Sequence, residues 1–246
     1  MDNKEQELIN LFNEIRNRGW IETKRHGDQC LGNAFEDLIG KDEDNKSEAD
    51  FYGIELKSHR TITKSMMSLF SKSPSYPKGV NTYLRETYGV VESDFGKKVL
   101  NTTISGFREN THRGGHSFKA VVNRCEERIY LQIRDLSTNK IIPEEIYWSF
   151  NVLKTALEKK LSKIAILYGD EKDENGIHYV RYTSMIILEG LTFEKLLTCL
   201  ENGELLIDIR IGVYSSGKNI GKTHDHGTAF RIHLENLLKY GILRKF

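Results

Sequence analysis

Two acids and a lysine stand close together in the first quarter of the chain. Asp50 is followed by Tyr52-Gly53, and Glu55 and Lys57 are two residues apart. Alternate residues of a β-strand share a face, so Glu55 and Lys57 project together from an expected strand over residues 50–58. A tight turn at Tyr52-Gly53 would fold Asp50 back beside Glu55.

This arrangement suits metal-assisted phosphodiester hydrolysis. Neighbouring carboxylates repel unless a cation joins them, and hard oxygen ligands favour Mg²⁺. We predict that Asp50, Glu55 and the backbone carbonyl of Leu56 bind Mg²⁺, with phosphate and water completing the coordination. Lys57 would hold or help deprotonate the attacking water and offset the phosphate charge. The alternative is a half-exposed strand with a surface ion pair.

The charge distribution points to a polyanionic partner. Residues 57–128 carry 13 Lys/Arg and 6 Asp/Glu, and residues 210–246 carry 7 and 2, although the whole chain is only +1. Two basic blocks on an otherwise acidic chain suggest a polyanion lying against part of the surface. The alternative is that these charges scatter once the chain folds. The expected phosphate contacts are Arg60, Lys72, Lys218 and Lys222.

The C-terminal quarter carries groups that can read base edges. His and Arg donate to guanine, and Asp accepts from cytosine, so mixed donors and acceptors suit a G·C-rich site. The expected readers are Asp208, Arg210, His224, Asp225, His226 and Arg231. A glycine-bearing loop before a final helix at about 228–240 would present the last four. Two alternatives stay open: a metal pair at His224 and His226, and a surface ion pair between Asp208 and Arg210.

The surrounding pattern predicts a mixed α/β (α+β) fold. Apolar spacing indicates helices over 5–18, 31–39, 150–161 and 193–201, and strands over 118–122, 129–133, 164–168, 177–182 and 205–213. Residues 59–116 give a weak pattern, too long for a passive connection. We read Trp20 and Trp148 as core residues.

Composition excludes several classes. The chain has 246 residues, 38% hydrophobic and 29% charged, as expected of a globular protein without long disordered tracts. Its longest apolar runs are too short to span a bilayer, and the N-terminus shows no export signal. Three isolated cysteines form neither a disulfide framework nor a zinc knuckle, which fits a reducing cytoplasm.

Several stretches resemble one nuclease family. Asp50 with Glu55-Leu-Lys57 matches the core motif of restriction-endonuclease-like nucleases, and the preceding Gly32-Asn-Ala-Phe-Glu36 resembles their accessory helix, with Glu36 a possible further metal or water contact. Further matching stretches lie at 19–25, 54–58, 69–74, 147–150, 208–212 and 221–231. Together these stretches resemble the MvaI/BcnI family of monomeric restriction endonucleases.

The resemblance implies a restriction-endonuclease-like mixed sheet flanked by helices, with two lobes around a DNA cleft. The catalytic lobe would come mainly from about 1–90 with later elements, and the recognition lobe mainly from about 145–240. It implies a monomeric, bacterial, cytoplasmic type II enzyme that nicks the two strands in sequence. The expected site is CCWGG, with CCSGG and CCNGG left open, and a companion DNA methyltransferase is expected. Asp50, Glu55 and Lys57 would be catalytic.

Two other functions remain under consideration. The same motif occurs in MutH-like mismatch-repair nickases, which would need an activating partner. A catalytically inactive DNA-binding module is the third possibility, although an intact Asp50, Glu55 and Lys57 argues against it.

Overall fold

The computed structural model describes residues 3–40, 49–63, 65–92 and 95–246. The chain divides into two compact units. The first comprises residues 1–67, 157–192 and 237–246, and the second comprises residues 68–156 and 193–236. The assignment of a catalytic lobe mainly to about 1–90 with later elements, and of a recognition lobe mainly to about 145–240, stays a prediction. Residues 157–192 join the N-terminal segment because their strands pair with strands of that segment, and residues 68–90 join the second unit.

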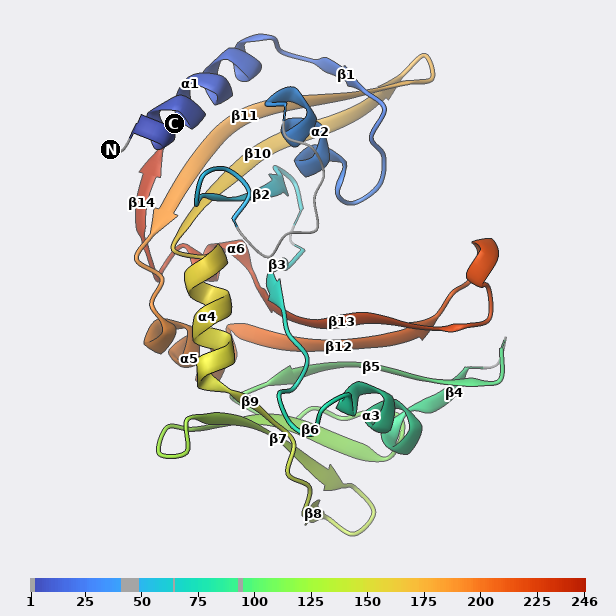
Figure 1. Ribbon diagram of the computed structural model, residues 1–246. Helices are drawn as coiled ribbons and strands as arrows, with labels where there is room; N and C mark the ends of the chain where they lie inside the picture. The colour runs from blue at the N-terminus through green and yellow to red at the C-terminus, as the bar shows by residue number, and fades with distance from the viewer. Residues whose placement is uncertain (1–2, 41–48, 64, 93–94) are drawn as a thin grey trace. The chain divides into compact units, whose positions relative to one another are not determined.

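The sheet of the first unit has the order β1-β11-β10-β2, with β14 beside β11 (Figure 1). Its strands are β1 (Ile21–Thr23), β2 (Glu55–Arg60), β10 (Lys163–Glu174), β11 (Ile177–Glu189) and β14 (Ile242–Lys245). The long β10–β11 hairpin is antiparallel, whereas β2 runs parallel to β10 with Glu55 opposite Ile164. The strand predicted around residue 55 is therefore confirmed, and it lies at one end of this strand order.

Helices α1 (Asn3–Asn17) and α2 (Cys30–Leu38) cover one face of this sheet (Figure 1). Their buried side chains share one core cluster with Leu56, Ala165 and Leu167. The hydroxyl of Tyr182 on β11 donates to the carbonyl of Leu31 at 2.7 Å, which fixes α2 on the sheet. Because Leu56 faces this core, Glu55 and Lys57 face the other side of β2.

The second unit contains two sheets. The first has the order β3-β13-β12-β5-β4, and in the second β7 pairs with β6, β8 and β9. Their strands are β3 (Met67–Ser71), β4 (Val90–Glu92), β5 (Lys97–Ser105), β6 (His116–Asn123), β7 (Arg128–Asp135), β8 (Lys140–Ile142), β9 (Tyr147–Ser149), β12 (Leu205–Val213) and β13 (Thr223–Ile232). The remaining helices are α3 (Val80–Tyr88), α4 (Phe150–Lys160), α5 (Phe193–Glu201), η1 (Gly217–Asn219) and α6 (Leu234–Leu237).

The two tryptophans differ in environment. Trp148 is fully buried against Phe230, and its indole N–H donates to the carbonyl of Lys72 at 2.8 Å, so it is a core residue as predicted. Trp20 is only half-buried, and its ring lies close to the cationic ends of both Lys172 (4.9 Å) and Arg181 (4.7 Å). The core prediction for Trp20 is wrong, because cation–π contacts hold this ring at the surface.

Most of the predicted elements are confirmed, and the mixed α/β class with them. Two predictions are wrong. Residues 223–232 form strand β13 rather than a loop and the start of a helix, and α6 has only four residues. The segment 59–116 contains β3, α3, β4 and β5, whose polar exposed positions weakened the sequence pattern. None of the helices in the described residues is both long and apolar enough to cross a bilayer.

Candidate functional site

The turn before β2 brings Asp50 beside the strand. Phe51 and Ile54 exchange two backbone hydrogen bonds of 2.9 Å across Tyr52-Gly53, and both turn residues have positive φ. A two-residue turn of this kind reverses the chain tightly. It allows Asp50 Oδ2 to accept a hydrogen bond of 3.0 Å from the backbone N–H of Leu56.

This bond also orients the Leu56 carbonyl. Within a strand the N–H and C=O of one residue point to the same side. The Leu56 N–H donates to Asp50 and so points away from the neighbouring strand β10. The carbonyl of Leu56 therefore points away from β10 as well. The peptide oxygen predicted as a metal ligand therefore lies on the side of β2 where the Asp50 carboxylate is held.

Glu55 is the buried acid of this site, with only 2% of its surface exposed. Its Oε1 accepts a 2.7 Å ion-paired hydrogen bond from Lys57 Nζ, which joins the two predicted catalytic side chains on one strand face. A second ammonium, that of Lys160 at the end of α4, lies 3.8 Å from the same oxygen. Sequence spacing gave no indication of Lys160, which is 105 positions from Glu55 along the chain.

The site's donor set fits a divalent cation. Glu55 Oε2 is buried and has no hydrogen-bond partner among the described residues. A buried, unpaired carboxylate oxygen is costly unless a cation or proton compensates it. With the Asp50 carboxylate and the Leu56 carbonyl nearby, the available ligands are all hard oxygens, the set that Mg²⁺ prefers.

Glu36 lies on the same face of α2 as Gly32, one turn further along. Gly32 lies directly against β2, where an added Cβ would come within 3.1 Å of Ser58 Oγ. This close approach explains the glycine of the predicted accessory helix. Glu36 does not join Asp50 and Glu55 in a three-ligand group of the described residues. Its expected contact with metal or water therefore stays a prediction.

His59 continues the strand face of Glu55 and Lys57. Its ring lies beside Tyr168, and its Nδ1 is buried without a hydrogen-bond partner in the described part of the chain. Burial lowers the pKa of His59, so the ring is neutral at pH 7. It therefore adds no positive charge beside the two lysines.

The predicted reader Asp208 is buried and fully engaged. Its Oδ2 pairs with Arg231 Nη1 at 2.7 Å across the β12–β13 ladder, and its Oδ1 accepts the hydroxyl of Thr103 on β5. The alternative ion pair with Arg210 is not formed. With 6% of its surface exposed, Asp208 is placed to hold Arg231 rather than to reach a base itself.

Arg210 is the unpaired reader. It forms no ion pair with any described residue, and its Nε is buried without a hydrogen-bond partner among them. The β12–β13 register shifts beside it: Ile209 pairs with Thr228 and Ile211 with Asp225. Two residues, His226 and Gly227, therefore lie opposite Arg210 in a bulge, which the positive φ of Gly227 permits.

The bulge fixes its neighbour Asp225. The Oδ2 of Asp225 accepts a hydrogen bond of 2.8 Å from Asn81 on α3, and its Oδ1 accepts one from the Gly227 N–H. Asn81 also donates to Ser73 and is itself buried. Asn81 is a positioning residue that the sequence pattern did not reveal, because it lies 144 positions from its partner.

The rings of Tyr214, His224 and His226 form a short stack. Tyr214 and His224 are nearly parallel with centroids 4.0 Å apart, and the His224 and His226 centroids are 3.8 Å apart. Partial burial, with the nearby charges of His224 and Arg210, lowers the pKa of His226. No third metal-binding side chain of the described residues joins the two histidines. The metal-pair alternative has no support.

The predicted phosphate contacts fall into two groups. Lys72, Lys218 and Lys222 are exposed, as phosphate contacts must be. Arg60 instead forms a 2.7 Å ion pair with Glu171 and lies 3.5 Å from Asp28. These pairs tie the loop before α2 to the sheet, so the geometry favours a structural role for Arg60.

One group of three side chains in the described residues could share a metal: Cys30, Glu171 and His178. Arg60 already donates to both oxygens of Glu171, at 2.7 and 3.2 Å. The Cys30 thiol donates to the carbonyl of Arg25, and burial, together with the charge of Glu171, raises the pKa of Cys30 to about 11. Arg60 already engages the Glu171 carboxylate and the Arg25 carbonyl engages the thiol, so we assign no metal here.

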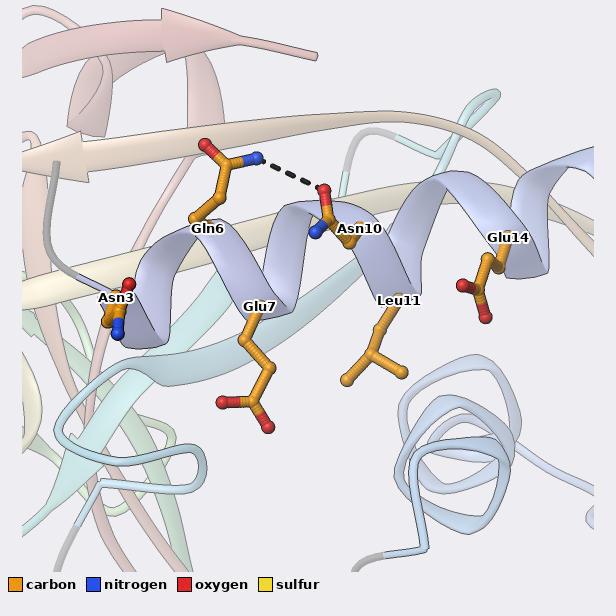
Figure 2. A pocket seen from close by; sticks show the side chains of 6 residues that line it. All are labelled: Asn3, Gln6, Glu7, Asn10, Leu11 and Glu14. Carbon is orange, nitrogen blue, oxygen red and sulfur yellow. Dashed lines mark hydrogen bonds between the residues drawn. The ribbon is translucent and has the colours of Figure 1, made fainter.

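A pocket of about 370 Å³ on α1 is lined by polar and acidic side chains together with Leu11 (Figure 2). Gln6 donates to Asn10 at 3.1 Å along its edge, and Glu7 and Glu14 add negative charge. An acidic lining repels phosphate, so this surface is unsuited to a nucleic acid. The pocket contains none of the predicted site residues.

Comparisons with known proteins identify the family. The family model described as "MvaI/BcnI restriction endonuclease family" matches residues 9–239. A solved structure described as "Restriction endonuclease MvaI-cognate DNA substrate complex" is 41% identical, covers 100% of this chain and 99% of its own, and has a TM-score of 0.92. A second, "Restriction endonuclease MvaI in the absence of DNA", is also 41% identical, covers 100% and 98%, and has a TM-score of 0.65.

A comparison with curated proteins found no match. The family model nevertheless spans nearly the whole chain, and the solved relatives are matched over their full length. The chain belongs to the MvaI/BcnI family and is a type II restriction endonuclease, a hydrolase that cuts DNA site-specifically.

Proposed function

We propose that this enzyme uses Mg²⁺ to hydrolyse duplex DNA within CCWGG, acting as a monomer that nicks the two strands in turn. One observation carries the metal assignment. The buried carboxylate of Glu55 has one oxygen paired with Lys57, while the other has no partner in the described residues. The sequence site and the cutting order rest on the family resemblance.

Three groups would hold the metal: the carboxylates of Asp50 and Glu55 and the backbone carbonyl of Leu56. Bound there, Mg²⁺ would supply a Lewis acid for the phosphate and lower the pKa of a bound water. The unpaired Glu55 Oε2 and the Asp50 contact with Leu56 support this assignment. Glu36 is a further candidate contact on α2.

Lys57 would act on the water and the phosphate. Its ammonium is held by Glu55 Oε1 at 2.7 Å and retains 21% exposure, so it can be reached by a substrate beside β2. There it can orient the attacking water and offset the negative charge that grows on the phosphate in the transition state. Glu55 would thus use Oε2 to bind the cation and Oε1 to hold Lys57.

Base recognition would come from strands β12 and β13. Arg210 has a guanidinium without an acidic partner in the described chain, and a guanidinium suits guanine O6 and N7. Arg231 would be held in place by Asp208, while His224, Asp225 and His226 would present further donors and acceptors from the bulge. Lys218, Lys222 and Lys72 would contact phosphates.

Cleavage of defined plasmids tests this proposal. With Mg²⁺ we expect discrete fragments from a plasmid that contains CCWGG sites and no fragments from a plasmid that contains only CCSGG sites. Adding EDTA should stop cleavage of the CCWGG plasmid. A nicked circle should appear before the linear form. Sequencing of the ends then gives the cut position, and light scattering gives the mass of the free enzyme.

The outcomes separate the alternatives. Nicks that require an added helper protein would favour a MutH-like nickase, and a gel shift without cleavage would favour an inactive binding module. Cleavage of CCSGG would keep the enzymatic class but reject the proposed central base pair. Full activity in EDTA would reject the metal assignment.

A further inference from the structure

A second lysine reaches the buried acid of the catalytic strand from a distant part of the chain. Lys160 is the last residue of α4, and its Nζ lies 3.8 Å from Glu55 Oε1. Its side chain keeps 30% exposure, whereas that of Glu55 keeps only 2%. Lys57 Nζ contacts the same oxygen at 2.7 Å, so two cations share one carboxylate oxygen.

The fold fixes this position. Leu161, directly after Lys160, is fully buried and its N–H donates to the Leu157 carbonyl, so the end of α4 is anchored. Strand β10 begins two residues later and places Ile164 opposite Glu55. The helix end is therefore tied to the register of the catalytic strand. A cation is also favoured at the C-terminal end of a helix dipole.

The balance of charges around Glu55 suggests a role for Lys160. Asp50 and Glu55 bring two negative charges, and Lys57 can neutralise only one of them. When Lys57 turns toward water or phosphate, Glu55 Oε1 loses its compensation inside a buried site, which is costly. Lys160 can compensate that oxygen in its place. With both lysines and a divalent cation, the site carries two positive charges beyond its acids, which matches the double negative charge of a phosphorane.

We propose that Lys160 is a positioning residue that keeps Glu55 Oε1 compensated, and so releases Lys57 for the attacking water and phosphate. This inference rests on the proposed catalytic role of Glu55 and Lys57. Lys160 acts through Glu55 and is not required to touch DNA. Its loss should slow the chemical step while leaving DNA binding largely unchanged.

The test compares Lys160→Met with Lys159→Met. Methionine keeps most of the aliphatic stem and removes the charge. Lys159 is the exposed neighbour on the same helix end and serves as the matched control. We expect Lys160→Met to lower the single-turnover cleavage rate at saturating Mg²⁺ by about 10- to 100-fold. Its Kd for a cognate duplex without metal and its Tm should stay at the level of Lys159→Met.

Lys160→Arg should restore most of the rate, because a cation returns to Glu55. A purely structural role would instead lower Tm and would not depend on charge. The inference is overturned if Lys160→Met cuts within about threefold of Lys159→Met, or if Lys160→Arg is as slow as Lys160→Met.

Glu55→Gln and Lys57→Ala distinguish this failure from failure of the proposed function. If both still cut, the catalytic assignment itself is wrong. If both are inactive while Lys160→Met matches the control, only the role of Lys160 is rejected.

Discussion

The carboxylate of Asp50 accepts a 3.0 Å hydrogen bond from the backbone N–H of Leu56. This bond joins the residue before the turn to the middle of the proposed catalytic motif. The position of the Asp50 carboxylate therefore depends on the conformation of the two turn residues, Tyr52 and Gly53. A change in the geometry of the turn should therefore change the cleavage rate.

Gly53→Ala should impair both folding and cutting. Gly53 has φ +90°, and an added Cβ would meet nothing within 4 Å, so the cost is backbone strain alone. We expect a loss of about 1–2 kcal/mol in the free energy of unfolding, together with slower cleavage as Asp50 moves away from Leu56. Urea denaturation and single-turnover kinetics measure the two effects.

The matched control is Tyr52→Asn, because asparagine tolerates the positive φ of Tyr52. It should cut at a rate close to that of the wild type. Equal cleavage by Gly53→Ala and the wild type would show that the turn does not position Asp50.

Lys57→Ala should abolish cleavage while DNA binding survives. The ammonium is expected to act on water and phosphate, so its removal should lower the rate by on the order of 10³-fold. Gel shifts in EDTA should give a Kd close to that of the wild type, since the proposed base and phosphate contacts lie on other residues. The control is Lys4→Ala, at an exposed position of α1, which should cut normally. Retained cutting by Lys57→Ala would remove Lys57 from the catalytic core.

Arg210→Ala and Lys218→Ala should affect DNA binding in different ways. Arg210 has no acidic partner in the described chain and is proposed to read a base, so its loss should weaken cognate binding by about 1–3 kcal/mol and leave non-cognate binding unchanged. Exposed Lys218 should weaken binding to all duplexes alike and reduce the salt slope by about 1. Equal weakening of cognate and non-cognate binding by Arg210→Ala would make Arg210 a phosphate contact instead.

Glu5 should contribute stability that disappears in acid. Burial alone would raise its pKa, but hydrogen bonds from Arg244 and Lys163 more than offset this and hold the pKa of Glu5 below its usual 4.5. A carboxyl group whose pKa is lower in the folded state contributes its full stabilisation of the fold at pH values above its unfolded-state pKa. That stability is lost as the pH falls through the folded value.

Glu5→Gln should therefore destabilise the protein by roughly 2 kcal/mol at pH 7, and the difference from wild type should shrink below pH 4.5. Denaturation across this pH range measures it. Glu7→Gln, in an exposed pair with Lys4, should change stability by no more than about 0.5 kcal/mol at either pH. A Glu5→Gln deficit that persisted unchanged at pH 3 would contradict the ion-pair account.

The local sequence pattern was sufficient to predict features that lie within a single helix or strand. The helices around Phe12 and Leu196 and the strand from Leu205 were predictable because their apolar residues keep a helical or alternating period. Glu55 and Lys57 were predictable for the same reason, since two residues on one strand must share a face.

The remaining features depend on partners that are distant in the sequence. Strand β13 was mistaken for a loop and a helix because its residues His224 to Gly227 are polar and end in the bulge at His226 and Gly227. Only the neighbouring strands β3 and β12 make the segment a strand. Asp208 was expected at a base edge, but Thr103 and Arg231 enclose it. Lys160 reaches Glu55 only through the β2–β10 pairing, which no local spacing encodes.

Strand β14 and the ion pairs of Arg244 complete the sheet that carries Glu55, and residues 237–246 are the last part of that unit to be synthesised. A ribosome-bound chain lacking them would leave Glu5 without the Arg244 guanidinium and β11 without its neighbour β14. The nascent protein should consequently stay locally unfolded around its proposed nuclease centre until translation has passed β12 and β13, the strands proposed to read the bases. Host DNA would then be exposed to this enzyme only after its ability to choose a sequence has been built.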